Sequence, residues 1–299
     1  MSTPIYVKNK LLGDNTSVDV LYHLGISGNR DQLRATFGDV RYVCFGGTGQ
    51  RMRTFAERLQ KKLGIDGELE DLGATGHRYA IFKVGPVLSV SHGIGSPSFL
   101  VALHEVVKLL EYARCRDATL IRIGTSGGLG VEPGSVVVSN GAVNDTVEQH
   151  YDFRVLGKIV KRPCVLDAEL AAEIVDDARR LCPDVSNVAT GKTMGASDFY
   201  EAQGRLDGAI CAYTDADKMS FLKRLQDEGV VNIEMEAAMF SAFCHHVGIR
   251  AAIVCVTLVD RLRGDQVATP NETLLQWQNR PLDVVAEFIA HKLRGHVSK

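Results

Sequence analysis

The chain lacks the features that mark a membrane protein, a secreted protein or a nucleic-acid-binding protein. Among its 299 residues, no apolar run approaches the roughly 20 residues that a membrane helix needs. The opening segment "MSTPIYVKNK" has no hydrophobic stretch typical of a signal peptide. Lys and Arg total 34 and Asp and Glu total 36, which gives a net charge of −2. We therefore expect neither nucleic acid nor a membrane surface as a partner, and any anion site must be local.

Paired cysteines are also missing. None of the seven cysteines is in C-x-x-C spacing. Cys44, Cys211 and Cys255 lie in apolar runs, where a cysteine usually behaves as a small buried hydrophobe. This usage predicts no disulfide framework, no metal site, and a reducing, cytoplasmic location.

Three glycine-rich turns are present, but none fits a nucleotide-binding motif. They read "GGTGQR" at 46–51, "GIGSPS" at 93–98 and "GTSGGLG" at 124–130. Met52 stands where a dinucleotide-binding motif needs its third glycine, and no Gly-Lys-Ser/Thr follows any turn. Nicotinamide and ATP motifs are thus excluded. Taken singly, each turn could simply join a strand to a helix.

Short apolar strands alternate with amphipathic helices along the chain. The patterns predict strands at 42–45, 78–84, 86–91, 118–123, 135–138, 230–233 and 251–259, and helices at 51–63, 93–112, 167–181, 234–247 and 271–293. Such alternation indicates a single α/β domain around a mostly buried sheet. We assign residues 41–299 to this domain and residues 1–40 to an N-terminal arm, which we expect to be loosely structured except for the apolar-aromatic "VLYHLGI" at 20–26.

Two arginines lie beside these turns. Arg51 begins a helix just after Gly47, where backbone N–H groups and a guanidinium can converge on one anion. Arg122 lies inside an apolar strand, and burying an unpaired guanidinium costs several kcal/mol. Its partner is either an internal carboxylate, such as Glu105 or Glu236, or a bound phosphate.

A second group of polar residues occurs in "DFYEAQGRLDG" at 198–208. If this segment is extended, Gln203 and Arg205 point to the same side. An amide beside a guanidinium suits a flat, imide-bearing ring, on which Phe199 can stack. The alternative is an ordinary polar surface loop.

The segment "NIEMEAAM" at 232–239 places acidic residues where a strand enters a helix. Such residues are common at helix N-termini because of the helix dipole. A carboxylate there can also accept hydrogen bonds from two adjacent sugar hydroxyls, with Met235 as an apolar wall.

Taken together, these segments resemble the uridine phosphorylases of the nucleoside phosphorylase-I family, most closely those of eukaryotes. The resemblance runs from about Val20 to the C-terminal helix. It rests on "YHLG" (22–25), "GGTGQRM" (46–52), "HRY" (77–79), "VSHGIGSPS" (90–98), "IRIGTSGG" (121–128), "DFYEAQGRLDGA" (198–209), "NIEMEAAM" (232–239) and "VCVTLVDRL" (254–262).

The resemblance implies a single α/β domain with a central mixed, partly barrel-like sheet flanked by helices. It also implies a homodimer with shared active sites, to whose interface residues 1–40 contribute. Phosphate would contact Gly47, Arg51, Arg122 and Thr125, and Arg78 of the partner subunit. Ribose would contact Thr125, Met235 and Glu236, and His23 of the partner subunit. The base would contact Phe199, Gln203, Arg205, Leu258 and Val259.

The activity implied is that of a pentosyltransferase in pyrimidine salvage. It would convert uridine and phosphate reversibly to uracil and ribose 1-phosphate, with deoxyuridine and thymidine as further candidate substrates. Arg122, Gln203 and Arg205 would be catalytic, and phosphate would be a co-substrate with no cofactor. Tyr79 replaces a glutamate that binds potassium in bacterial relatives, which argues against a monovalent-cation site. Asp260 keeps a purine nucleoside phosphorylase open as an alternative, beside a nucleosidase and a catalytically weak paralogue.

Overall fold

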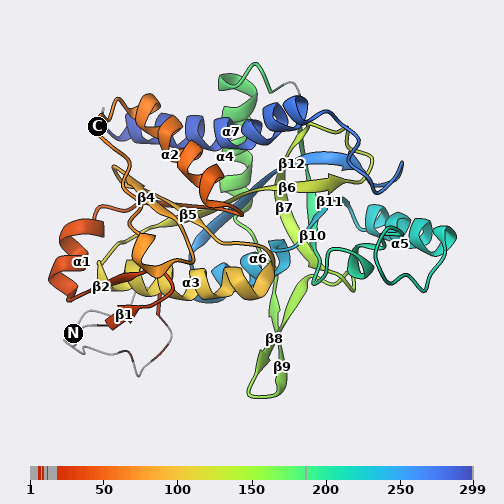
Figure 1. The fold of residues 1–299 in the computed structure, drawn as a ribbon, viewed down its shortest axis with the longest axis horizontal. Helices are drawn as coiled ribbons and strands as arrows, with labels where there is room; N and C mark the ends of the chain where they lie inside the picture. The colour runs from red at the N-terminus through yellow and green to blue at the C-terminus, as the bar shows by residue number, and fades with distance from the viewer. Residues whose placement is uncertain (1–5, 8, 10–11, 13–18, 186, 298–299) are drawn as a thin grey trace.

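A twisted sheet of eight strands runs through the molecule between two layers of helices (Figure 1). The computed structural model describes residues 6–7, 9, 12, 19–185 and 187–297. The sheet order is β11-β10-β7-β12-β6-β3-β5-β4, and β11 also pairs with β6. Two separate hairpins, β1–β2 and β8–β9, complete the strands of the described residues.

The strands are β1 (Asp19–Leu21), β2 (Ile26–Gly28), β3 (Tyr42–Gly46), β4 (Ile81–Val84), β5 (Val87–Ser91), β6 (Thr119–Gly128), β7 (Val136–Asn144), β8 (His150–Val155), β9 (Lys158–Pro163), β10 (Val188–Gly195), β11 (Val230–Glu234) and β12 (Arg250–Asp260). The helices are α1 (Arg30–Phe37), α2 (Gly49–Leu63), α3 (Gly95–Tyr112), α4 (Ala168–Leu181), α5 (Asp215–Asp227), α6 (Ala237–Val247) and α7 (Asn271–Val297), with short 3₁₀ turns η2 (Ala74–Gly76) and η3 (Glu201–Gln203).

Part of the sheet closes into a five-stranded barrel because β6 has two sets of partners. Its first half pairs in parallel with β3, from Tyr42↔Thr119 to Gly46↔Ile123. Its last residues, Gly127 and Gly128, pair antiparallel with β11. Strands β12, β7 and β10 complete the ring from β6 back to β11. This confirms the predicted mixed, partly barrel-like sheet in a single α/β domain.

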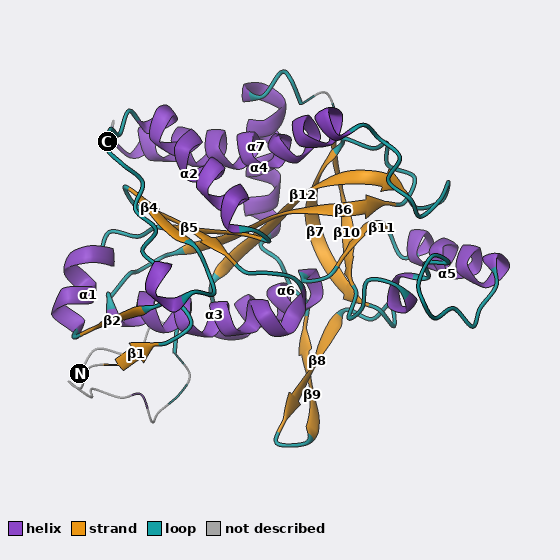
Figure 2. Cartoon of the chain, viewed as in Figure 1, coloured by secondary structure: helices purple, strands orange, loops and turns teal. Residues whose placement is uncertain are grey.

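Both faces of the flat part of the sheet are covered, which explains its continuous apolar strands. Along β3, Val43 and Phe45 face one cluster with α3 and α6, while Tyr42 and Cys44 face a second cluster with α2, α4 and α7. Figure 2 shows the two helix layers on opposite sides of the orange sheet. The alternation follows the two-residue period of a β-strand.

Most predicted elements are present, with bounds shifted by a few residues. The sequence analysis missed strand β10 of the central sheet, helix α5, and the β8–β9 hairpin, which projects from the body of the molecule. It also missed β1, β2 and α1 near the N-terminus. Strand β9 is largely exposed, and α5 buries only Lys218, Leu222 and Leu225, so neither has a strong apolar pattern. No helix among the described residues is long and apolar enough to span a membrane.

The expectation of a loosely structured arm is wrong for residues 27–40, which contain the end of β2 and helix α1. Leu33 and Phe37 of α1 belong to the larger core cluster, together with Leu21 and Leu24 of the apolar segment 20–26. Residues 1–5, 8, 10–11 and 13–18 of the arm lie outside the described residues. The domain boundary and the arm's contribution to a dimer stay predictions.

The cysteines are all free. Cys44 and Cys255 are buried, as their apolar runs predict, and burial raises the pKa of both thiols. The prediction of burial is wrong for Cys211, which is exposed because its segment crosses the surface ahead of α5.

Candidate active site

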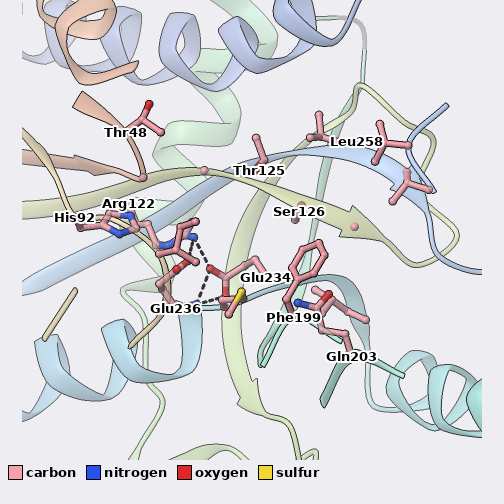
Figure 3. Close-up of a pocket in the computed structure, with 18 of the residues that line it drawn as sticks. Thr48, His92, Arg122, Thr125, Ser126, Phe199, Gln203, Glu234, Glu236 and Leu258 are labelled. Atoms are coloured by element: carbon pink, nitrogen blue, oxygen red, sulfur yellow. Dashed lines mark hydrogen bonds and ion pairs between the residues drawn. The ribbon is translucent and has the colours of Figure 1, made fainter. Parts of the chain in front are cut away.

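A cavity of about 310 Å³ opens where several strands of the sheet end. Strands β5, β3 and β6 run parallel as neighbours, so their carboxyl ends lie at one edge. In open α/β sheets this is where ligands bind. The cavity is lined from β3, β5 and β6 at one end and by loop 198–208 at the other. Figure 3 shows His92 and Arg122 at the first end, and Phe199 and Gln203 at the second.

The first end contains the turn after β3 and the start of α2. Thr48 caps this helix by accepting a hydrogen bond from the Arg51 backbone N–H. Gly47 and Arg51 both line the cavity, and their contact with phosphate stays a prediction. The Arg51 guanidinium donates to Gln278 Oε1 of α7 at 3.0 Å. Burial and the nearby charge of Arg122 lower the pKa of Arg51.

Arg122 extends from β6 into a buried cluster of charges, whose dashed contacts are drawn in Figure 3. Its Nη2 is 2.7 Å from Glu234 Oε2 and also donates to Glu236. The internal carboxylate partner considered from the sequence is therefore present. It is Glu236, joined by Glu234, and not Glu105. Arg122 nevertheless lines the cavity, so the ion pair and a bound anion are not exclusive.

Two carboxylates share one guanidinium here, and they differ in pKa. Burial and the charge of Glu236 raise the pKa of Glu234 despite the opposing effect of Arg122. For Glu236 burial acts in the same upward direction, but Arg122 and His92 outweigh it and hold the pKa low. Glu236 Oε1 also accepts from the backbone N–H of Gly95. We therefore treat Glu236 as the ionised partner of Arg122.

Gly124 leaves the space that the Arg122 guanidinium occupies, because it has no side chain. Residues two apart in a strand point to the same side, so the Arg122 side chain lies over the next residue but one. A Cβ on Gly124 would be 2.2 Å from Arg122 Nη1 and 3.0 Å from its Cζ. The "IRIG" pattern thus has a packing reason, because a larger residue would push the guanidinium out of its carboxylate contacts.

His92 lies at the carboxyl end of β5 and lines the same end of the cavity. The residue is 1% exposed, and its ring stacks on Phe99 with centroids 4.2 Å apart. Burial, followed by the charge of Arg122, lowers the pKa of His92 to about 3. The ring is therefore neutral near pH 7.

The second end of the cavity is built by loop 198–208. The extended conformation considered from the sequence is wrong for this loop. Glu201–Gln203 form a 3₁₀ turn, and Gly204 has φ +61°. The tight turn still directs Gln203 and Arg205 to the cavity. Phe199 lines it too, and the Arg205 guanidinium lies 4.5 Å from the centre of the Phe199 ring.

Arg205 is held by acceptors on two sides. Its Nε and Nη2 donate to the two carboxylate oxygens of Asp207 at 2.9 and 2.6 Å. Nη2 also donates to the backbone carbonyl of Asp265 at 2.9 Å. These bonds fix the plane of the guanidinium.

Sequence reasoning missed Arg261, a fully buried residue of this end of the cavity. Its Nη2 donates to the Gln203 carbonyl at 2.9 Å and its Nη1 to Gln203 Oε1 at 3.3 Å. Asp265 accepts from Arg261 and from the buried Lys218 of α5. Arg261 thereby orients the Gln203 amide. The only sequence signal was an arginine within the apolar "TLVDRL" run.

The remaining predicted wall residues, Thr125, Met235, Leu258 and Val259, all line the cavity. Two predicted residues do not. His23 is 39% exposed in the β1–β2 turn and bonds Glu105 at 2.7 Å, and Arg78 is exposed beside η2. Both were expected to act in the site of a partner subunit, which stays a prediction.

Asp260 also lies outside the cavity lining. Its Oδ1 accepts hydrogen bonds from the backbone N–H groups of Gly130 and Leu262. The carboxylate thereby stabilises the turn after β12.

Comparisons with known proteins agree with this geometry. Residues 41–290 match the phosphorylase superfamily. The chain is 48% identical to mouse uridine phosphorylase 1 over 278 residues, 92% of this chain and 89% of the mouse protein. A structure from a study of two uridine phosphorylases of the oomycete Phytophthora capsici superposes with a TM-score of 0.92 at 45% identity, covering 98% of this chain and 100% of that chain.

A further relative shows that similarity alone does not guarantee turnover. The inactive uridine phosphorylase B of Schistosoma mansoni is 38% identical over 274 residues, 91% of each chain. Family membership is nevertheless clear from the extent of the match. The chain belongs to the phosphorylase superfamily, and within it to the uridine phosphorylases.

Proposed function

We propose that this protein catalyses the reversible phosphorolysis of uridine to uracil and ribose 1-phosphate, as a step in pyrimidine salvage. The observation that carries the proposal is the two-ended cavity. One end presents Arg51 and Arg122 at strand ends, and the other presents Gln203 beside Arg205. An oxyanion can therefore bind at one end and a planar imide at the other, with a ribose between them.

At the first end, phosphate would occupy the space beside the Gly47 turn and the two guanidinium groups. Phosphorolysis passes through a cation-like state at C1′ of the ribose, and the attacking phosphate supplies the balancing negative charge. The protein's part is to fix that anion in place, because positioning a reactant removes much of the entropic barrier. The Arg122 guanidinium, held in place by its ion pair with Glu236, would be oriented before phosphate arrives.

At the second end, Gln203 and Arg205 would recognise uracil. The Gln203 oxygen accepts from Arg261 and retains a second lone pair for a ring N–H, while its amide N–H groups can meet a carbonyl. Arg205 uses Nε and Nη2 internally, which leaves Nη1 for another carbonyl. Each donor aimed at charge that develops on the leaving base is typically worth about 3 kcal/mol.

The position of Asp260 disfavours a purine nucleoside phosphorylase. An aspartate at this point of the sequence kept that alternative open, but the residue lies outside the cavity lining and accepts hydrogen bonds from backbone N–H groups. A nucleosidase, which uses water, would have no need of Arg51 and Arg122 at one end. Deoxyuridine and thymidine remain candidate substrates of the same cavity.

We further propose a homodimer in which His23 and Arg78 enter the partner subunit's cavity. These residues lie on neighbouring loops, since Thr75 Oγ1 donates to the carbonyl of Gly25 at 2.9 Å. Both are accessible and outside their own cavity. Two adjacent exposed loops could thus carry both residues together. We also propose a reducing, cytoplasmic location for the protein. The reaction would need no cofactor, and phosphate would be a co-substrate.

Subunit mixing tests the shared site. A dimer of Arg78→Ala subunits and a dimer of Arg51→Met subunits would each be inactive. In a mixed dimer, one of the two sites combines an intact Arg51 from one subunit with an intact Arg78 from the other. Recovery of activity on mixing supports the proposal, whereas two inactive proteins that stay inactive after verified exchange contradict it.

The reaction itself is tested by incubating the protein with phosphate and each of uridine, thymidine and inosine, while base release is followed by absorbance. We expect phosphate-dependent release of uracil. Faster cleavage of inosine would contradict the pyrimidine assignment.

A further inference from the structure

His92 lines the cavity, yet both of its ring nitrogens lack hydrogen-bond partners in the described part of the chain. Neither Nδ1 nor Nε2 has a hydrogen-bond partner among the described residues, although both atoms are buried. A buried polar atom without a partner costs about 1–3 kcal/mol. Such a group calls for a ligand, and His92 lines the cavity.

The ring is also held too firmly to find a partner by moving. Its backbone N–H donates to the Gly46 carbonyl at 2.9 Å, and its own carbonyl accepts from Ser98 Oγ at 2.7 Å. The face of the ring stacks on Phe99, which in turn stacks on Phe240. The orientation of the imidazole is therefore preset before any ligand binds.

The surroundings indicate which ligand the ring would take. Figure 3 shows His92 beside Arg122, at the end of the cavity opposite Phe199 and Gln203. Arg122 Nε is likewise buried without a partner in the described chain. The Gly46 contact places His92 next to the Gly47 turn, which also lines the cavity. Unpaired donors from two strands thus gather at one place, which suits an oxyanion.

A neutral imidazole is the appropriate donor at this place. Arg51 and Arg122 already supply positive charge, and a third cation would raise their mutual repulsion. A neutral ring carries one N–H donor and one acceptor nitrogen. It can add a directional hydrogen bond to an anion without adding charge.

We propose that His92 is a ligand of the co-substrate phosphate, with one ring nitrogen donating to a phosphate oxygen beside Arg51 and Arg122. This inference rests on the proposed function and assigns a further residue to that site. A neutral donor to an anion contributes roughly 10- to 100-fold in affinity.

The test uses variants that separate the ring's shape from its nitrogens. His92→Phe keeps the stack on Phe99 and removes both nitrogens. His92→Asn and His92→Gln restore an amide N–H near the positions of Nδ1 and Nε2, respectively. His104→Phe is the matched control, because this exposed residue lies on α3 outside the cavity lining.

We expect His92→Phe to raise the KM for phosphate, and for ribose 1-phosphate in reverse, by about 10- to 100-fold. The KM for uracil should stay within about threefold, His104→Phe should match the parent, and one amide variant should recover part of the phosphate affinity. An unchanged phosphate KM in a folded, active His92→Phe enzyme would overturn the inference while leaving the proposed function intact. If turnover falls while the KM for phosphate and the KM for ribose 1-phosphate both stay unchanged, the ring is only structural and the inference is wrong.

A binding measurement keeps the two proposals apart. Protein with ¹⁵N-labelled histidine is titrated with inorganic phosphate in the absence of nucleoside, and the His92 signals are assigned by their absence in His92→Phe. A saturable shift of one ring nitrogen supports the inference even if the parent shows no phosphorolysis. Unmoved signals at phosphate concentrations that saturate the site by calorimetry would refute it, as would a parent that binds no phosphate.

Discussion

The double role of Arg122, as ion-pair partner and as phosphate ligand, can be separated by two substitutions. Arg122→Met removes the guanidinium and leaves Glu234 and Glu236 facing each other in the protein interior. Glu234→Gln, added to that variant, removes one of the two charges. If Arg122 only neutralises carboxylates, Glu234→Gln should restore function. If Arg122 also binds phosphate, Glu234→Gln should restore stability but not activity.

The expected magnitudes follow from the burial of the cluster. The side chains of Arg122, Glu234 and Glu236 are 4%, 2% and 5% exposed, so solvent screens them little. Removing one partner of a buried ion pair typically costs about 3–5 kcal/mol, which lowers the melting temperature of a chain of this length by roughly 5–8 °C. Without Arg122 the pKa of the buried Glu234 rises further, so in the double variant we expect part of that loss to be recovered, mainly above neutral pH, where the glutamine avoids a second buried charge.

The assay is a double-mutant cycle, with the free energy of unfolding and kcat/KM measured for all four proteins. Both proteins that carry Arg122→Met should lose at least about 100-fold in kcat/KM for phosphate, as is typical when a preorganised electrostatic contact is removed. Calorimetry should show weakened phosphate binding in both. A double variant with parental activity would refute the reasoning and reduce Arg122 to an internal salt bridge.

Three further predictions concern single positions. Gln203→Leu should lower kcat/KM for uridine by about 100-fold or more with unchanged phosphate binding by calorimetry; a loss of phosphate binding would show that the two ends of the cavity are not independent. Gly124→Ala should displace the Arg122 guanidinium and raise the phosphate KM, and a crystal structure of that variant with both carboxylate contacts intact would contradict this. The third prediction is acid stability: the folded-state pKa of His92 is about 3 against an ordinary value of 6.5, so stability is lost as pH falls below 6.5. Relative to His92→Phe, the parent should lose about 2.5 kcal/mol of unfolding free energy between pH 7 and pH 4.5 in phosphate-free urea titrations, whereas parallel pH profiles would argue against a buried neutral ring.

The sequence predicted the strand-and-helix framework because both faces of the sheet are covered. Strand β3 and residues 251–256 of β12 are then continuously apolar, and helices such as α2 keep a clear apolar stripe. Helix α5 and the β8–β9 hairpin escaped notice because they bury few side chains and so leave little pattern.

The candidate site was predicted where a residue's type is at odds with its local pattern. Arg122 in an apolar strand is such a case, and the proposed carboxylate partner Glu236 was found beside it. The sequence could not reveal that Glu234 shares the guanidinium, because strand register and the entry into α6 place that carboxylate.

Contacts between distant segments could not be inferred from the sequence. The network that orients Gln203 joins α5, the turn after β12 and loop 198–208, through Lys218, Asp265 and Arg261. The unpaired ring of His92 was equally hidden, since its isolation depends on what surrounds it in three dimensions.

The most direct test of the account is phosphate-dependent uracil release from uridine by the purified protein. We expect ribose 1-phosphate and uracil in equal amounts, with no release when phosphate is omitted. Free ribose formed without phosphate, or a protein that binds phosphate but leaves uridine intact, would contradict the central claim.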